Sequence, residues 1–314
     1  MSKTSIDAVR LALSGPAMGS RWTAVAFAPA TVDGKALADR LAAAVEAVEQ
    51  EMSTWRPNSD LMRLNGAPIG EWIAIPADLA HVLAAALRIG RLSEGAFDIG
   101  VGRAVASWGF GAQAAEQPGP LAMRDSLAVE SLELDERGRR ARKRAAVTLD
   151  LSAIAKGFGV DALARALDAE GLGAYLVGID GELRAKGVKP DGEPFAVALE
   201  RPEAGVRAAM GVIALEDAAI ATSGDYRHFR DAKGLRVSHT IDPRSGAPVS
   251  HALASVTVLR PTAMEADAFA TALMALGPDR GPDLARELGL DALFVTRDAH
   301  GLTHKGVGLF GRDG

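Results

Sequence analysis

The feature that most restricts the fold of this chain is the alternation of helix-like and strand-like hydrophobic patterns along its whole length. Apolar residues recur at helical spacing, which predicts helices over residues 37–52, 77–87, 155–167, 263–276 and 282–288. Short apolar runs predict strands over residues 22–28, 174–178, 195–199, 255–259 and 292–296. Neither an internal repeat nor a low-complexity tract interrupts this order. The sequence therefore predicts a compact α+β protein in which helices and strands are mixed.

Two irregular segments separate the patterned regions. Residues 111–120 combine glycine, proline and polar residues and predict an exposed loop, where we place a lobe boundary within a single unit spanning residues 1–314. The basic run 137–144 invites interpretation as a nucleic-acid or membrane contact, but acidic residues precede it and the strand-like segment 147–151 follows it. We therefore interpret the basic run as the solvated turn of a hairpin.

Composition and charge disfavour several classes of protein. A formal net charge of -5 and a pI near 5.7 argue against a nucleic-acid partner, because such proteins need a surplus of basic residues. The absence of cysteine excludes disulfides, thiolate nucleophiles and Cys-ligated metals. Near the start, only the short patch 9–13 is apolar, too short for a membrane span or a signal-peptide core. We expect no membrane span and a cytoplasmic location as given, or a periplasmic one if an export leader was removed.

A candidate metal-binding pair lies in the predicted helix within residues 261–277. Asp267 and Thr271 are four residues apart, so they lie on the same face one turn from each other. A carboxylate and a hydroxyl are hard oxygen ligands of the kind that hold magnesium while phosphates and water complete its octahedron. A surface aspartate with a threonine at this spacing also occurs without any function, and its truncation would then open no cavity in the core.

A candidate anion-binding turn spans residues 150–161, with the sequence DLSAIAKGFGVD. A strand-like run ends at Asp150, and a helix is predicted to open near Lys156. Backbone amides at a helix start favour an anionic ligand, and the lysine charge adds to this. An ordinary strand-to-helix connection would tolerate the same residues, with Asp150 and Asp161 serving only as capping and solubilising groups.

The segment 221–249 contains TSGDYRHF and SHTIDPRSG, two turn-rich stretches with several polar side chains. His239 is a candidate acid or base because its ordinary pKa is close to neutral pH. A structural histidine is the alternative. The other five histidines lack comparable neighbours, and no two histidines have the spacing of zinc ligands.

Aromatic residues form only 5% of the chain, and three of them stand in glycine-rich or proline-punctuated motifs. Trp55, Phe97 and Trp108 are candidates to sandwich a flat ring system, and burial in the core is the alternative for each. The sequence has neither a Gly-x-Gly-x-x-Gly fingerprint nor a Gly-Lys-Ser/Thr phosphate loop, which disfavours ordinary Rossmann flavoenzymes and nucleoside triphosphatases.

Taken together, these motifs resemble those of the FAD:protein FMN transferases, the ApbE-type flavin transferases. The resemblance covers residue 18 to about residue 277. Its motifs, in order, are MGSRW (18–22), MSTWRPNS (52–59), GAFDIGVG with WGFG (95–111), DLSAIAKGFGVD (150–161), RAKGVKPDG (184–192), TSGDYRHF (222–229), SHTIDPRSG (238–246) and ADAFATAL (266–273).

The resemblance implies a catalytic unit of two interdigitated lobes, with FAD in the cleft between them and Mg²⁺ on its pyrophosphate. It implies an FAD site formed by Met18, Trp55, Ala96, Phe97, Asp98, Asp150, Lys156 and Ile241, and metal ligation by Ala153, Asp267 and Thr271. Ala153 can contribute only a backbone carbonyl. Some relatives carry a second acid where this chain has Ala270, and the segment 178–182 departs from the Asn-Ile-Gly-Gly-Asp that is common in the family.

The activity implied by the resemblance is Mg²⁺-dependent transfer of the FMN moiety of FAD to a threonine of an acceptor protein, with release of AMP. His239 or Asp242 is the expected proton acceptor. Acceptors in the family present a Ser/Asp-Gly-Ala-x-Thr type motif, whereas the similar segment 245–249 here ends in valine, so we expect no self-modification. The alternatives are an Mg²⁺-dependent FAD pyrophosphatase that yields FMN and AMP, and a non-catalytic FAD-binding protein.

Overall fold

The computed structural model describes residues 8–116, 119–121, 126–203, 205, 207–225, 229–232 and 235–311, and of residues 229–232 and 235–237 it describes the backbone alone. In this part of the chain the largest sheet has eight strands, and each neighbouring pair is antiparallel. Their order across the sheet is β1 (Ala8–Ala17), β2 (Ser20–Pro29), β6 (Tyr175–Ile179), β7 (Glu182–Lys186), β10 (Ala219–Gly224), β15 (Leu253–Arg260), β16 (Asp291–Asp298) and β17 (Gly301–Val307).

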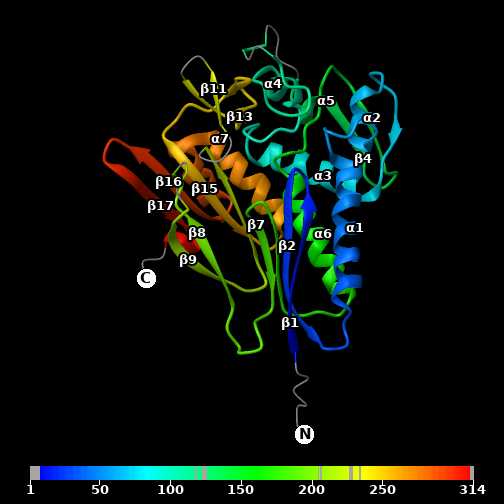
Figure 1. Ribbon diagram of the computed structural model, residues 1–314. Helices are drawn as coiled ribbons and strands as arrows, with labels where there is room; N and C mark the ends of the chain where they lie inside the picture. Colours follow the sequence, from blue (N-terminus) through cyan, green and yellow to red (C-terminus); the bar gives the residue numbers. More distant parts are fainter. Residues whose placement is uncertain are drawn as a thin grey trace.

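The remaining elements surround this sheet (Figure 1). The helices are α1 (Gly34–Met52), α2 (Asp60–Gly66), α3 (Ala77–Leu92), α4 (Gly102–Ser107), α5 (Ala128–Ser131), α6 (Ala155–Ala169), α7 (Ala263–Glu287) and the 3₁₀ helix η1 (Gly308–Gly311). The smaller sheets are β3 (Ile73–Ala74) with β5 (Arg140–Lys143) and β4 (Leu132–Asp135), β8 (Phe195–Glu200) with β9 (Ala209–Leu215), β11 (Phe229–Ala232) with β12 (Leu235–Ser238), and β13 (Ile241–Asp242) with β14 (Ala247–Pro248).

Alternation along β2 fixes how the sheet meets its helices. Trp22, Ala24, Ala26 and Ala28 are buried at every second position, so they form one row on one face of the strand. This row packs in one core with the apolar stripe of α1 and with α6. Helix α7 lies beside α6 and packs over β10 and β15, which extends the helical layer along the sheet.

The opposite face of the sheet is partly covered by the β8–β9 ribbon. Phe195 and Val197 of β8 and Leu215 of β9 form a smaller core with residues of β7, β10 and β15. Phe27, which alternates with the buried row of β2, lies 6.3 Å from Phe195 between ring centroids. The sheet is therefore the middle layer between helices and a two-stranded ribbon.

The structure confirms the α+β class and the five helices and five strands predicted from apolar patterns, with one difference in detail. The helices expected at 263–276 and 282–288 are joined within α7, which kinks at Gly277, where φ is 81°. The boundary expected near 111–120 stays a prediction, and residues 117 and 118 lie outside the described residues. No helix of the described part is long and apolar enough to cross a membrane.

The interpretation of the basic run was wrong in one respect. It is not only a turn, because its second half is strand β5, and segment 147–151, expected as the partner strand, makes only an isolated bridge at Thr148. The hairpin forms between β4 and β5, and opposite charges face each other across it, with Glu133 opposite Arg142 and Asp135 opposite Arg140.

Two hairpin turns reach the same end of the large sheet. The turn between β1 and β2 is Met18-Gly19, with φ of 46° and 74°, and the turn between β6 and β7 is Asp180-Gly181, with φ of 52° and 117°. Positive φ at both positions is the requirement of a two-residue I′ hairpin turn. Strands β2 and β6 are neighbours, and the Ser20 hydroxyl donates to Asp180 Oδ1 at 3.3 Å. The two tips therefore lie side by side.

Candidate active site

A cavity of about 810 Å³ opens at these hairpin tips. Its volume falls in the range of roughly 300–1,000 Å³ typical of small-molecule sites. Its wall draws on the end of α1, the segments near residues 97 and 153, strands β8 and β10, and helix α7. Twelve of the thirteen site residues expected from the sequence line it, namely Met18, Trp55, Ala96, Phe97, Asp98, Asp150, Ala153, Lys156, His239, Ile241, Asp267 and Thr271. Residues distant in sequence thus meet around one space.

The aromatic residues of the cavity differ in exposure. Trp55 is 70% exposed, which is unusual for so large an apolar side chain, whereas Phe97 is buried at 2%. Both line the cavity, together with Phe110. Trp108 does not line it, and its indole Nε1 donates instead to the Gly246 carbonyl at 2.9 Å. An exposed tryptophan at a cavity rim is available to stack on a flat ring.

Glu49 of α1 accepts hydrogen bonds from both the β1–β2 turn and the loop that carries Trp55. Its Oε1 accepts a hydrogen bond from the Met18 backbone N–H at 2.7 Å, and its Oε2 accepts one from Arg56 at 2.8 Å. Arg56 also forms an ion pair with Glu46, one turn earlier on the helix. The loop that carries Trp55 is therefore held against α1 by charge.

Asp98 and Asp150 shape the adjoining wall. Asp98 Oδ1 accepts from the backbone N–H of Gly100 at 2.6 Å and of Ala128 at 2.8 Å. Burial raises the pKa of Asp98, although these backbone donors act against the rise. Asp150 Oδ1 accepts from the Ser152 N–H at 2.8 Å, which closes a tight turn before α6. Both carboxylates thus hold backbone in place.

Asn65 fixes the chain just before Asp150. Its side-chain Nδ2 donates to the Leu149 carbonyl at 2.9 Å, and its Oδ1 accepts from the Leu149 N–H at 2.8 Å. The Asn65 side chain therefore makes both hydrogen bonds to the Leu149 backbone that a neighbouring strand would make.

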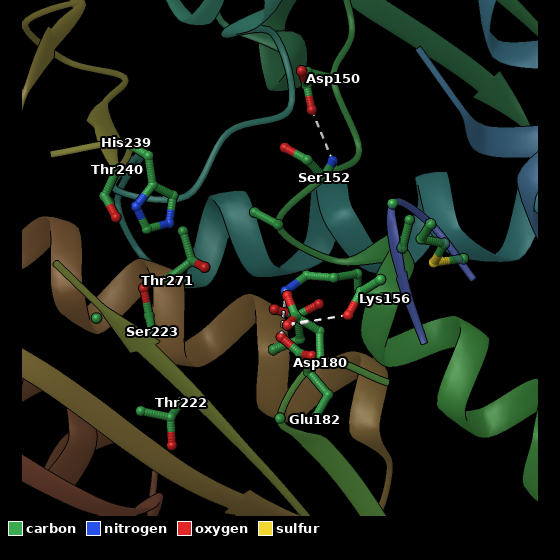
Figure 2. Close-up of a pocket in the computed structure, with 18 of the residues that line it drawn as sticks. Asp150, Ser152, Lys156, Asp180, Glu182, Thr222, Ser223, His239, Thr240 and Thr271 are labelled. Carbon is green, nitrogen blue, oxygen red and sulfur yellow. Dashed lines mark hydrogen bonds and ion pairs between the residues drawn. The ribbon is translucent and has the colours of Figure 1, made fainter. Parts of the chain in front are cut away.

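Lys156, in the first turn of α6, lies in an acidic cluster (Figure 2). Its ammonium lies 2.7 Å from Glu182 Oε1 and 3.5 Å from Asp180 Oδ2. Burial by itself lowers the pKa of Lys156, but the neighbouring carboxylates, Glu182 foremost, outweigh burial and raise it. The ammonium of Lys156 is therefore paired with carboxylates of the protein itself, and Lys156 also lines the cavity.

Asp267 is buried, only 7% exposed, rather than on an open helix face as the sequence suggested. Its Oδ2 accepts a hydrogen bond from the Gly157 N–H at 3.0 Å. Burial raises the pKa of Asp267 to about 7, and the negative charge of Glu182 adds to this, while Lys156 opposes it. Truncation of this side chain would therefore leave a buried donor unpaired.

The 150–161 motif positions α7 as well as the cavity wall. Asp161 accepts from the N–H groups of Ala263 at 3.0 Å and Met264 at 2.9 Å, so it caps the helix that carries Asp267. A Cβ on Gly157 would lie 2.3 Å from the Ala263 carbonyl oxygen, so only glycine permits this approach of α6 to α7. The capping role considered for Asp161 is confirmed.

The residues at the end of the cavity near Asp267 fit a magnesium ion. Asp267, Thr271 and Ala153 all line this cavity, and a carboxylate, a hydroxyl and a backbone carbonyl are the kinds of oxygen ligand that magnesium prefers. Three carboxyl groups, on Asp180, Glu182 and Asp267, face one ammonium, and Glu182 Oε2 is buried with no hydrogen-bond partner among the described residues. The excess of carboxylates over cations and the unpaired Oε2 of Glu182 both favour a bound cation at this end of the cavity. Among the described residues, no group of three or more acidic or histidine side chains is placed to hold a metal ion.

His239 lines the cavity on another side, near Thr240 and Thr271 in the view of Figure 2. Asp242 does not line the cavity. Its Oδ1 accepts from Arg244 Nε at 2.9 Å, and Arg244 also donates to the Ala275 carbonyl of α7 at 3.3 Å. Asp242 therefore anchors the loop after His239. Tyr226, Arg227 and His228 of the TSGDYRHF motif lie outside the described residues.

Sequence reasoning missed Asp180, Glu182 and Glu49 as residues of the cavity wall. The signal for the first two was the Asp-Gly pair at 180–181, a strong indicator of a two-residue hairpin turn between apolar strands. No local signal marks Glu49, which follows the apolar stripe of α1 as an ordinary polar helix residue.

Comparison with known proteins gives a consistent picture. The model of the ApbE family matches residues 18–294. A FAD:protein FMN transferase of Haemophilus influenzae is 38% identical, with 96% of this chain and 90% of the relative aligned, and one of Vibrio cholerae is 37% identical, with 92% and 88% aligned.

Solved structures agree with the sequence relatives. The apo form of the Pseudomonas stutzeri flavinyl transferase ApbE has a TM-score of 0.88 at 35% identity, covering 99% of this chain and 100% of that one. The flavin transferase ApbE from Vibrio cholerae has a TM-score of 0.86 at 36% identity, covering 95% and 97%. The family expected from the eight motifs is confirmed, and this chain is an enzyme of the ApbE family.

Proposed function

We propose that this enzyme transfers the FMN moiety of FAD to a threonine hydroxyl of an acceptor protein in a magnesium-dependent reaction that releases AMP. The observation that supports this most is the single cavity that places Trp55, the start of α6, Asp267 and His239 around one space. Those groups suit a ring system, a pyrophosphate, a divalent cation and a proton transfer, in that order.

FAD is the substrate that the cavity would bind. Trp55 and Phe97 offer faces and edges for the isoalloxazine ring, and the exposed position of Trp55 leaves its face open. The amides at the start of α6 favour the pyrophosphate through the helix dipole. Lys156 is already paired with Glu182. We therefore assign its positive charge to balancing the acidic groups at this end of the cavity, in addition to the FAD contact predicted from the sequence.

Asp267, Thr271 and the Ala153 carbonyl would hold the magnesium ion. When bound, the ion would neutralise charge that develops on the pyrophosphate. The protein contributes a carboxylate fixed by Gly157 and a helix fixed by Asp161, so the ligands are positioned before substrate arrives.

The transfer forms one bond and breaks one. The threonine oxygen of the acceptor attacks the phosphorus of the FMN half, and the bond from that phosphorus to the bridging oxygen breaks, so AMP leaves with the electron pair. The threonine proton passes to His239, which lines the cavity, rather than to Asp242, which Arg244 holds outside it. Positioning and charge stabilisation supply the rest of the catalysis.

Intact-mass measurement of an acceptor bearing the Ser/Asp-Gly-Ala-x-Thr motif tests the proposal. After incubation with FAD and Mg²⁺, we expect an acceptor heavier by one FMN phosphoester, with one AMP released per adduct, and neither product with the chelator EDTA. Free FMN and AMP without an adduct would instead indicate a pyrophosphatase. Intact bound FAD alone would indicate a binding protein.

A further inference from the structure

Glu182 carries a buried carboxylate oxygen that accepts no hydrogen bond from the described residues. The residue begins β7, is only 4% exposed, and lines the cavity. Its Oε1 accepts from Lys156 Nζ at 2.7 Å, whereas Oε2 has no hydrogen-bond partner among the described residues. Buried acceptors of native proteins are nearly always satisfied by protein, ordered water or a ligand. The cavity is therefore where a donor to Oε2 is expected.

The surroundings of Glu182 restrict the chemistry of that donor. Asp180 lies on the same hairpin tip and contacts the same lysine, and the negative charge of Glu182 acts on Asp267. A phosphate oxygen is excluded as a direct partner, because it is anionic and cannot donate. A neutral or positively polarised O–H or N–H group fits, above all a water molecule polarised by a cation.

Helix α7 provides few ligands for such a cation. Asp267 and Thr271 are one turn apart, and Ala270 between them is buried and has no side-chain ligand atom. Magnesium keeps an octahedral shell and retains several waters when the protein supplies few ligands. Those waters need acceptors, and groups that accept from a metal's inner shell tune its affinity.

We propose that Glu182 is an outer-sphere partner of the magnesium ion, its Oε2 accepting a hydrogen bond from a water of the ion's shell. This inference rests on the magnesium site of the proposed function. The Lys156 contact engages Oε1, which leaves Oε2 of this cavity-lining residue as the oxygen without a hydrogen-bond partner among the described residues. Glu182 is a positioning residue and touches no reacting atom.

Calorimetric titration of MgCl₂ into the protein without FAD tests this assignment. Glu182→Gln keeps the shape of the side chain and removes its charge, and we expect a roughly 10- to 100-fold higher dissociation constant for Mg²⁺, the usual effect of losing such a partner. Asp180→Asn is the matched control, because Asp180 contacts the same lysine from the same turn and asparagine tolerates its positive φ of 52°. We expect a clearly smaller loss for this control.

The outcomes separate this inference from the proposed function. An Mg²⁺ affinity of Glu182→Gln within twofold of wild type, or an equal loss in Asp180→Asn, overturns the outer-sphere role while FMN transfer by the wild type still stands. If the wild type does not bind Mg²⁺, the metal assignment of the proposed function falls as well. Thermal melting without metal checks folding, and should Glu182→Gln not fold, Glu182→Asp retracts the oxygens by one methylene and must still weaken Mg²⁺ binding.

Discussion

Lowering the pH from 8 to 6 should weaken magnesium binding through Asp267. Burial raises the pKa of this carboxyl to about 7, helped by the charge of Glu182. A metal-binding carboxylate must be ionised, so protons and Mg²⁺ compete for the same oxygens. The competition falls within an experimentally convenient pH range because the pKa lies so far above the ordinary value of 3.8.

The expected magnitude follows from the titration of one group. With a pKa of about 7, roughly nine-tenths of the carboxyl is ionised at pH 8 and roughly one-tenth at pH 6, so the apparent Mg²⁺ dissociation constant should rise about tenfold. Near pH 7, each Mg²⁺ bound should release about half a proton. Calorimetry at both pH values, in two buffers of different ionisation enthalpy, measures both quantities. Equal affinity at pH 6 and pH 8, with no proton release, would refute the reasoning.

The same raised pKa predicts the sign of a stability effect without metal. Between about pH 4 and pH 7 the folded protein holds the Asp267 proton more tightly than the unfolded chain does. This contribution to stability is fully present below the unfolded pKa and is lost as the pH rises through about 7. Melting temperatures from pH 5 to pH 8 should therefore fall more steeply for the wild type than for Asp267→Asn, and Mg²⁺ should restore stability at the upper end. Parallel pH profiles of the two proteins would contradict this.

Three further substitutions test the cap, the ring contact and the proton transfer. Asp161→Ala leaves two buried N–H groups of α7 and the Arg184 guanidinium unpaired, so we expect about 3 kcal/mol less stability by urea unfolding, against less than about 1 kcal/mol for Asp78→Ala in an exposed ion pair. Trp55→Ala should keep its melting temperature and weaken FAD binding by about 1 kcal/mol, about fivefold, in a fluorescence titration; unchanged affinity would remove the stacking role. His239→Asn should lower the transfer rate by roughly 10² to 10⁴ with FAD affinity unchanged, whereas normal turnover would make His239 structural.

Periodicity carried most of the fold prediction because it reports local burial. The stripe from Leu37 to Met52 predicted α1, and the apolar run from Trp22 to Ala28 predicted β2, whose alternating burial only the structure shows. The hairpin of β4 and β5 was misjudged, because its basic strand has charged residues on both faces and pairs with the preceding acidic segment rather than with segment 147–151.

The sequence by itself identified twelve residues that line the cavity, through eight motifs whose order and spacing resemble one family, and it predicted that Asp267 and Thr271 share a helix face. The tertiary structure alone decided their environment. Burial of Asp267, its contact with Gly157 and the acidic groups around Lys156 arise where α6, α7 and the β6–β7 turn converge. A sequence pattern records which face of an element is apolar, but the free energy of a charge depends on the charges and solvent that distant segments place around it.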